Sequence, residues 1–183
     1  MQSIFGTDGI RGIFDKEITY DLAQKIGYAF GTINNDIQKV LIGRDTRVSG
    51  DLLLEALSNG LNQSGKEVLD IGICPTPAIP FLINKFKIYA GIMISASHNP
   101  PEYNGIKIFD HYGRKLNQKK EIEIESCLNK IKSNLIFRKE KKIIQKFELL
   151  EVYKQSLIDS IGNNNLNGMK IILDTCHGSA SVF

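Results

Sequence analysis

The apolar residues of this chain follow two different spacings that alternate along it. Residues 19–34 begin with a threonine suited to cap a helix, and their apolar side chains recur every three or four positions, at Leu22, Ile26, Ala29, Phe30 and Ile33. This spacing predicts an amphipathic helix. Further helices are predicted over residues 51–65, 78–86, 117–132 and 148–161. The third of these is expected to turn inward Ile122, Leu128 and Ile131.

Short apolar runs of strand length lie between these segments. They predict buried strands over residues 39–43, 67–72, 90–96, 105–110 and 169–175. Residues 133–146 are basic and polar enough to form a connection, in which NLIFR or KKIIQKF offers a short strand. The stretch FGTDGIRG at 5–12 is expected to be a loop.

Strands that alternate with helices are typical of layered α/β proteins. We therefore expect a helix/mixed-sheet/helix domain over residues 1–161. Residues 162–168 are rich in turn formers and predict a boundary. The apolar run that follows is then the first strand of a second, similar domain, of which residues 162–183 contain only the start.

Charge and composition exclude several classes of protein. The 23 basic and 20 acidic residues leave a formal net charge of only +3, too small to indicate binding to nucleic acid or to an anionic membrane. No apolar run approaches the roughly 20 residues of a membrane span, and the N-terminus lacks a signal-peptide core, so we expect a cytoplasmic protein. The widely spaced Cys74, Cys127 and Cys176 predict neither a disulfide framework nor a zinc site.

The stretch ISASHNPPEYNGIKIF at residues 94–109 is the strongest candidate for chemistry. An apolar strand runs into a polar turn that displays Ser97, and α/β proteins collect ligands beyond the carboxyl ends of their strands. A serine there can act as a nucleophile or carry a phosphate, with His98 in a supporting role. The alternative is a structural turn, held by hydrogen bonds from serine and asparagine side chains to the backbone.

Two cations are candidates to assist this serine. Lys107 lies in the apolar run GIKIF, where strand alternation places it on the face opposite Ile106 and Ile108. It is either a proton carrier or phosphate partner, or a lysine that snorkels at a sheet edge. Arg11, in the glycine-rich FGTDGIRG, offers a guanidinium fork to an anion.

The stretch GRDTRVSG at 43–50 repeats the combination of glycine and arginine. Here we favour a structural role, in which Asp45 pairs with an arginine and fixes the loop while Ser49 caps the following helix. The chain has no Walker A sequence, no dinucleotide-binding fingerprint and no cluster of aspartates suited to magnesium.

Taken together, four stretches resemble the α-D-phosphohexomutase superfamily: FGTDGIRG, GRDTRVSG, PTPA at 75–78 and ISASHNPPEYNGIKIF. The first is most similar to members that act on glucosamine phosphate; mannose and glucose phosphate stay open as alternatives. The resemblance implies an isomerase in which a phosphoserine gives its phosphoryl group to a hexosamine 6-phosphate. The resulting 1,6-bisphosphate reorients and returns its other phosphate to the serine, which leaves the 1-phosphate.

The resemblance also assigns roles to residues. Ser97 is implied as the phosphoserine, and His98 and Asn99 shape its turn. Lys107 and Arg11 are implied as the proton-transfer and phosphate-stabilising groups. The implied metal is Mg²⁺, bound through the phosphate on Ser97, because the family's aspartate ligands are missing from this chain. Glucosamine or glucose 1,6-bisphosphate is the implied activator.

Members of the family have four domains, and this chain resembles the first together with the opening strand of the second. We therefore expect an N-terminal piece that is inactive alone and that, in the whole protein, serves the synthesis of UDP-N-acetylglucosamine for peptidoglycan. The implied partner is a hexosamine phosphate, with neither nucleic acid nor membrane, and a dimer stays open. From a different class, an orphaned first domain could instead bind phosphate or a protein partner without catalysis.

Overall fold

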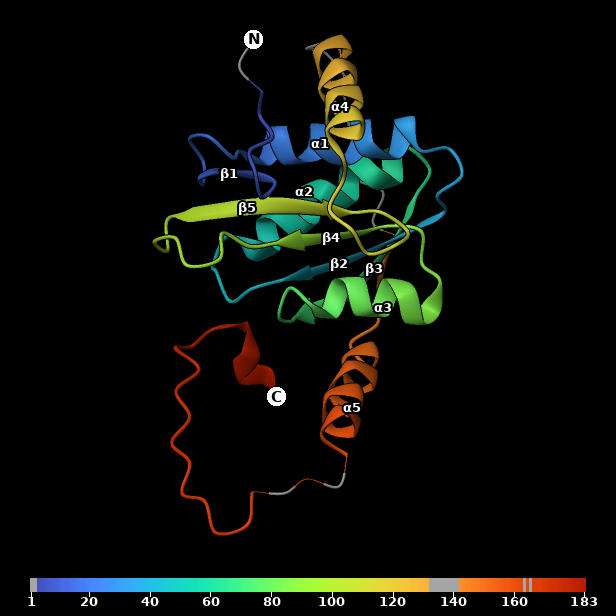
Figure 1. Ribbon diagram of the computed structural model, residues 1–183. Helices are drawn as coiled ribbons and strands as arrows, with labels where there is room; N and C mark the ends of the chain where they lie inside the picture. Colours follow the sequence, from blue (N-terminus) through green and yellow to red (C-terminus); the bar gives the residue numbers. More distant parts are fainter. Residues whose placement is uncertain (1–2, 132–141, 163, 165) are drawn as a thin grey trace.

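The computed structural model describes residues 3–131, 142–162, 164 and 166–183 (Figure 1). The predicted helices and the strands expected over 39–43, 67–72, 90–96 and 105–110 are all present, with small shifts at their ends. The helices are α1 (Tyr20–Ile33), α2 (Gly50–Gln63), α3 (Ala78–Phe86), α4 (Gln118–Lys130), α5 (Leu149–Ile161) and the short 3₁₀ helix η1 (Ser179–Val182). The strands are β1 (Ile10–Ile13), β2 (Lys39–Arg44), β3 (Glu67–Ile73), β4 (Gly91–Ile94), β5 (Tyr103–Phe109) and β6 (Ile143–Gln145).

The strands form one sheet in the order β1-β5-β4-β2-β3-β6. Strands β4, β2, β3 and β6 run parallel, whereas β5 is antiparallel to both of its neighbours, β1 and β4. The sheet is therefore mixed, as the sequence predicts. Because β5 has a strand on each side, its residues lie in the interior of the sheet.

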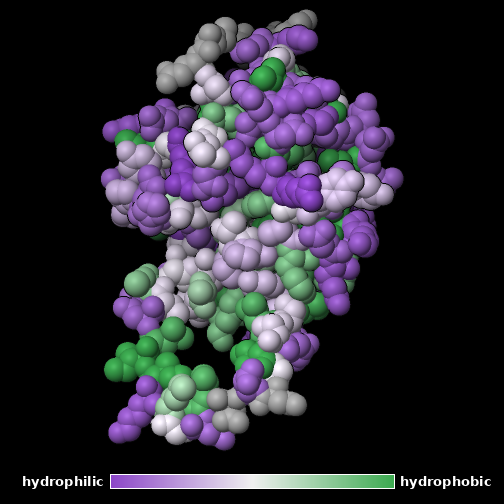
Figure 2. Space-filling view, in the orientation of Figure 1, coloured by the Kyte–Doolittle hydropathy of each residue, from purple (hydrophilic) through white to green (hydrophobic). Residues whose placement is uncertain are grey.

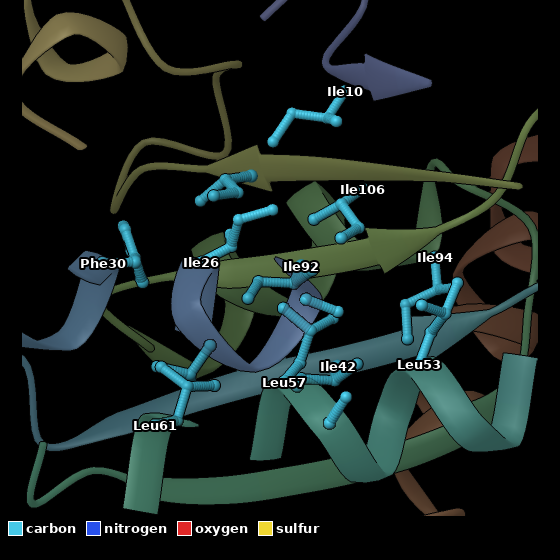
Figure 3. Packing of buried hydrophobic residues seen from close by; sticks show 14 of the residues in the cluster. Ile10, Ile26, Phe30, Ile42, Leu53, Leu57, Leu61, Ile92, Ile94 and Ile106 are labelled. Atoms are coloured by element: carbon cyan, nitrogen blue, oxygen red, sulfur yellow. The ribbon is translucent and has the colours of Figure 1, made fainter. Parts of the chain in front are cut away.

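Helices cover both faces of this sheet, which confirms the predicted helix/mixed-sheet/helix layering (Figure 1). Apolar side chains of α1 and α2 pack on one face, against Ile42, Ile92 and Ile106 (Figure 3), with α4 beside α1. Helix α3 covers the other face, against Leu41 and Met93, and α5 packs against α3 through Tyr153 and Phe81 (Figure 1). The adjacent Leu41 and Ile42 are both fully buried, as expected for a strand that is covered on its two faces.

The first helix begins where the sequence predicts. The hydroxyl oxygen of Thr19 accepts a hydrogen bond from the backbone N–H of Leu22 at 3.1 Å, which satisfies one of the amides that a helix leaves unpaired at its start. Asn117 caps α4 in the same way, with its side-chain oxygen accepting from Lys120 N at 3.0 Å.

The sequence does not predict β1. This strand lies partly within the glycine-rich stretch that was expected to be a loop, and it pairs with β5 through Ile10 and Ile106 among others. Its burial alternates over only four residues, so its apolar pattern is too short to distinguish a strand from a loop.

The prediction of which α4 side chains face the core is partly wrong. Ile124 is fully buried, whereas Ile122 is 54% exposed. Ile124 lies four residues before Leu128 and seven before Ile131, so these three side chains share one helical stripe, and both Leu128 and Ile131 are partly buried against the core. Ile122 falls outside that stripe.

The buried strand expected over residues 169–175 does not form. This stretch is irregular and exposed, with Ile172 99% and Leu173 82% accessible, and no described strand pairs with it. Hydrophobic surface gathers at the lower left of Figure 2, where the C-terminal segment runs in Figure 1. The boundary expected near residue 162 stays a prediction; α5 ends at Ile161, directly before it.

The basic connection over residues 133–146 contains a strand at its end. Residues Ile143–Gln145 form β6 and pair with β3, which confirms the strand offered by KKIIQKF. The alternative strand, NLIFR, lies outside the described residues. Within the described part of the chain, no helix combines the length and apolar character needed to cross a membrane.

The three cysteines form no disulfide, as the sequence predicts. Cys74 is buried, Cys127 is partly buried and Cys176 is exposed. Burial, with a smaller contribution from the nearby Asp70 carboxylate, raises the pKa of the Cys74 thiol to about 12. Cys74 therefore keeps its proton and behaves as a small apolar side chain in the layer between the sheet and α3.

Candidate active site

Ser97 follows β4 at the carboxyl end of the parallel strands and has an unusual backbone conformation. Its φ is +58°, in the left-handed region that costs a residue with a side chain on the order of 1 kcal/mol. The buried Ser95 helps to hold this conformation, because its hydroxyl accepts a hydrogen bond from Ser97 N at 3.0 Å. The turn therefore exposes Ser97 at the edge of the sheet.

Arg47 holds the same turn from the other side. Its guanidinium donates hydrogen bonds to the backbone carbonyls of Ser97 (3.0 Å), Asn99 (2.7 Å), Pro100 (2.6 Å) and Tyr103 (2.8 Å). Its Nε donates to the carboxylate of Asp45 at 3.1 Å, which confirms the predicted pairing of Asp45 with an arginine. The serine turn, residues 95–103, thus rests on a largely buried ion pair from the loop after β2.

Ser49 does not cap α2 as expected. It occupies the N-cap position but makes no side-chain hydrogen bond to the helix backbone. Its hydroxyl instead accepts a hydrogen bond at 2.8 Å from the side-chain amide of Asn104, which is fully buried. The other atom of that amide accepts from Gly105 N at 2.8 Å, so Asn104 ties the end of the serine turn to the start of α2.

Arg11 and Lys107 meet at a carboxylate that sequence reasoning missed, that of Asp8. One oxygen of Asp8 pairs with the guanidinium of Arg11 and also with Lys107 Nζ, at 2.5 Å from the latter. Partial burial opposes the ionisation of Asp8, but the two cations outweigh it and hold its pKa below the ordinary value. The signal in the sequence was a carboxylate three residues before Arg11, within FGTDGIRG.

Lys107 does not lie at a sheet edge. It is on β5, opposite Met93 of β4, and its side chain is only 13% exposed. Its neighbours Ile106 and Ile108 pack in the layer of α1 and α2, so Lys107 is on the other face, as strand alternation predicts. The snorkelling alternative is therefore wrong.

Hydrogen bonds and ion pairs connect these two cations to the serine turn in different ways. Arg11 Nη1 donates to the side-chain oxygen of Asn99 at 3.2 Å, which connects Arg11 directly to the turn. Lys107 is connected through Asp8 and Arg11. His98 lies beside Ser97, with Nδ1 3.5 Å from the serine hydroxyl oxygen.

A cavity of about 640 Å³ opens in front of Ser97. Ser97 and His98 line it, together with Asp45, Arg47 and residues 176–179 of the C-terminal segment. The segment is attached there by the hydroxyl of Thr46, which donates to the His177 carbonyl at 2.9 Å. Arg11 and Lys107 are absent from the described residues that line this cavity, so the structure brings the predicted site residues together in two groups.

The described residues do not fit a magnesium site. Among them, no three or more histidine, cysteine, aspartate or glutamate side chains converge in a way that could hold a metal ion. Mg²⁺ prefers several oxygen ligands, and this part of the chain would offer a phosphate on Ser97 without a carboxylate set beside it.

Comparison with known proteins identifies relatives. The family description "Phosphoglucomutase/phosphomannomutase, alpha/beta/alpha domain I" matches residues 2–135. The chain is 59% identical over 182 residues to a protein named phosphoglucosamine mutase from Prochlorococcus marinus (strain MIT 9515), covering 99% of this chain and 40% of that protein. It is 43% identical over 181 residues to the protein of that name from Synechococcus sp. (strain WH7803), covering 98% of this chain and 39% of the relative.

Solved structures agree on the fold. A phosphoglucomutase/phosphomannomutase family protein from Burkholderia thailandensis superimposes with a TM-score of 0.72 at 28% identity, over 91% of this chain and 37% of that one. The phosphoglucomutase parafusin from Paramecium, at 18% identity, has a TM-score of 0.75 over 97% of this chain and 39% of its own, a likeness of fold alone. The chain thus spans about 40% of the length of the curated relatives it matches.

Proposed function

The chain belongs to the phosphoglucomutase/phosphomannomutase family, and from that membership we propose that it is the N-terminal part of a phosphoglucosamine mutase. The whole protein interconverts glucosamine 6-phosphate and glucosamine 1-phosphate, and this chain supplies the phosphoserine. The observation that carries the proposal is the display of Ser97 in a left-handed conformation at the carboxyl end of β4, on a turn held by Arg47.

The proposed reaction leaves the protein phosphorylated at the end of each turnover. A hydroxyl oxygen of the sugar phosphate attacks the phosphorus on Ser97, the bond from phosphorus to the serine oxygen breaks, and the hydroxyl proton goes to a base. The sugar then holds two phosphates. In the second transfer the serine oxygen attacks the other phosphorus, the bond from that phosphorus to the sugar oxygen breaks, and the sugar oxygen takes the proton back from the base. The serine is then phosphorylated again and the isomeric sugar monophosphate is released.

Arg11 and Lys107 are proposed to stabilise the charge of the transferred phosphoryl group and to transfer the proton of the attacking hydroxyl. Their shared partner Asp8 is 52% exposed, so a phosphate on Ser97 competes with it for the two cations. His98, beside the serine hydroxyl, is proposed to shape the turn and to donate to a phosphate oxygen. These roles are supported by position, and variants of each residue test them.

The remaining elements of the proposal come from the family. Magnesium would neutralise charge on the phosphoserine, with its carboxylate ligands supplied from outside the residues described here. A glucosamine or glucose 1,6-bisphosphate would phosphorylate Ser97 at the start. We also propose a cytoplasmic location, a hexosamine phosphate as the partner, and a role in forming peptidoglycan precursors. The mass of the whole protein in solution, measured by sedimentation, tests whether it forms a dimer.

Sugar choice is tested with the full-length protein that carries these residues. Glucosamine 1-phosphate, mannose 1-phosphate and glucose 1-phosphate are supplied in parallel, with magnesium and the matching bisphosphate, and formation of each 6-phosphate is measured. We expect the glucosamine sugar to be the preferred substrate. Preference for mannose or glucose phosphate would overturn this part of the proposal in favour of the other activities in the family name.

Phosphorylation of Ser97 is tested by mass spectrometry of the peptide that contains it, after incubation with the bisphosphate. We expect Ser97→Ala to abolish both the phosphopeptide and the activity. Ser126→Ala, on the exposed surface of α4 and outside the lining of this cavity, is the matched control and should retain both. Full activity of the Ser97→Ala protein would show that another group carries the phosphate.

The isolated 183-residue polypeptide gives a separate outcome. We expect no measurable isomerisation, because its described residues hold no metal-binding carboxylate set. Turnover by this polypeptide alone would contradict the need for the rest of the protein. A folded polypeptide that binds phosphate, paired with a full-length protein without mutase activity, would support the non-catalytic alternative.

A further inference from the structure

Arg47 uses every hydrogen-bond donor it has. A guanidinium carries five N–H groups, one on Nε and two on each terminal nitrogen. In Arg47, Nε donates to Asp45, Nη1 donates to two carbonyls and Nη2 donates to two more. Although Arg47 lines the cavity in front of Ser97, none of its N–H groups is left for a ligand.

Arg11 differs from Arg47 in this respect. Its described hydrogen bonds use one N–H of Nη1, to Asn99, and one of Nη2, to Asp8. Its buried Nε has no hydrogen-bond partner among the described residues. Arg11 therefore has donors to offer an anion, whereas Arg47 could bind one only by releasing the backbone of the serine turn.

The four carbonyls that Arg47 binds belong to a single short segment. They lie between Ser97 and Tyr103, and the first is the carbonyl of the residue with φ +58°. A left-handed conformation at a residue other than glycine persists only where surrounding contacts impose it. One planar group that binds both ends of the segment is such a contact.

The anchor of Arg47 is itself rigid. The side chains of Arg47 and Asp45 are only 10% and 12% exposed. The second oxygen of Asp45 accepts from the backbone N–H of Arg47 at 3.1 Å, so the carboxylate binds both the backbone and the side chain of the same residue. The direction of the guanidinium is thereby fixed relative to β2, from which this loop emerges.

We propose that Arg47 is a positioning residue: it holds Ser97 in the left-handed conformation that presents its hydroxyl for phosphoryl transfer, and it does not bind the transferred phosphate. This inference rests on the proposed function for its kinetic consequence. Its structural part, the restraint of the turn, does not depend on any activity of the protein.

The structural part is tested by hydrogen–deuterium exchange of the 183-residue chain, comparing wild type with Arg47→Lys. A lysine has three donors at one point and cannot replace the planar fork. We expect the peptide covering residues 97–103 to exchange at least about tenfold faster, a loss of roughly 1.4 kcal/mol of local protection, while peptides from α1 and α2 are unchanged. Unchanged exchange of the turn would overturn the proposal.

The kinetic part uses the full-length protein. Because misplacement of a reacting group by about 1 Å can lower a rate about 100-fold, we expect Arg47→Lys to lower kcat by about that factor with KM for the sugar phosphate within about twofold. A raised KM at unchanged kcat would instead make Arg47 a substrate ligand and overturn the proposal. Arg114→Lys, on an exposed loop, is the matched control and should match wild type.

Two further cases separate the structural part of the proposal from its kinetic part. If Arg47→Lys does not yield folded protein, Asp45→Asn takes its place, because it weakens the anchor and leaves the arginine present; faster exchange of the turn is again expected, and unchanged exchange again overturns the proposal. If wild-type protein transfers no phosphoryl group to Ser97, the proposed function fails, and the exchange result alone decides whether Arg47 restrains the turn.

Discussion

Two segments face each other across the same cavity, and they are held in very different ways. The serine turn joins two strands of the sheet, and the side chains of Arg47 and Ser95 bind its backbone. The opposite wall, residues 176–179 of the C-terminal segment, is attached through Thr46 and through the contact of Phe183 with Tyr153. The comparison shows that a residue can be displayed at a surface while its backbone is fully restrained.

The apolar residues of the two segments reinforce this difference. The run that leads to the serine turn, β4, has all four of its residues buried between two strands and two helical layers. The run in the C-terminal segment has similar composition, yet Ile172 and Leu173 are almost fully exposed. An apolar run becomes a strand where a neighbouring strand satisfies its backbone, and not from composition alone.

The largest expected difference between the two segments is in the free energy of unfolding when one isoleucine in each is replaced by alanine. Ile94→Ala, at the end of β4, removes a fully buried side chain and should lower the free energy of unfolding by about 2–5 kcal/mol. Ile172→Ala should change it by less than about 0.5 kcal/mol, because that side chain is 99% exposed. Urea denaturation of the 183-residue chain measures both. Equal effects would mean that the C-terminal run is buried in solution.

A smaller effect is expected at Gly105, under the serine turn. An added Cβ would lie 2.5 Å from the carbonyl oxygen of Ser95 and 2.9 Å from that of Ile10. Since both are backbone atoms, one in β1 and one directly after β4, Gly105→Ala should cost about 1–3 kcal/mol of stability. Gly6→Ala is the control, because its Cβ would meet only Gly9 O at 3.5 Å. The same thermal midpoint for the two variants would show that the sheet relaxes around Gly105.

The pairing of Asp8 with two cations predicts a modest dependence on pH. Because the pKa of Asp8 is lowered in the folded protein, its carboxylate stabilises the fold above its ordinary value of 3.8, and this stabilisation is lost as the pH falls through the lowered value. The difference in thermal midpoint between wild type and Asp8→Asn should therefore be largest near neutral pH and shrink in acid. A difference that grows on acidification would contradict the ion pairs.

The smallest effect concerns the attachment of the C-terminal segment. The rings of Phe183 and Tyr153 are tilted, with centroids 5.7 Å apart, and Phe183 is 41% exposed. Phe183→Ala should reduce stability by no more than about 1 kcal/mol. It should also speed proteolysis between residues 162 and 183, whereas Tyr112→Ala, which removes another exposed ring, should not. Slower cleavage of the Phe183→Ala chain would contradict this attachment.

Much of the fold is predictable because its pattern is local. Among the described residues, five helices and four of the six strands follow from apolar spacing, and β6 is one of the two short strands offered in the basic connection. The face on which Lys107 lies follows from strand alternation. Strand β1 escapes because it depends on pairing with β5, nearly a hundred residues away along the chain. The strand expected at 169–175 fails for the converse reason: its local pattern is clear, but no described neighbour completes it.

Sequence reasoning could select candidate site residues by type and position, but it could not predict the contacts between them. Ser97, His98, Arg11 and Lys107 stand out by their positions after strands or among glycines. The role of Asp8 depends on β1 and β5 lying side by side, and the bond from Asn104 to Ser49 spans 55 residues, so neither could be inferred from a local pattern. The pairing of Asp45 with an arginine was predicted because the two lie in one short stretch, and the structure identifies the arginine as Arg47.

The graded burial of the three thiols makes the chain a convenient object for chemical labelling. A maleimide dye reacts with thiolate, which the buried Cys74 does not form at neutral pH, and the pKa of Cys127 is also raised by burial. Cys176 is exposed and lines the cavity. A fluorophore placed on Cys176 would sit opposite Ser97 and report through its emission when an anion enters the space between the two walls.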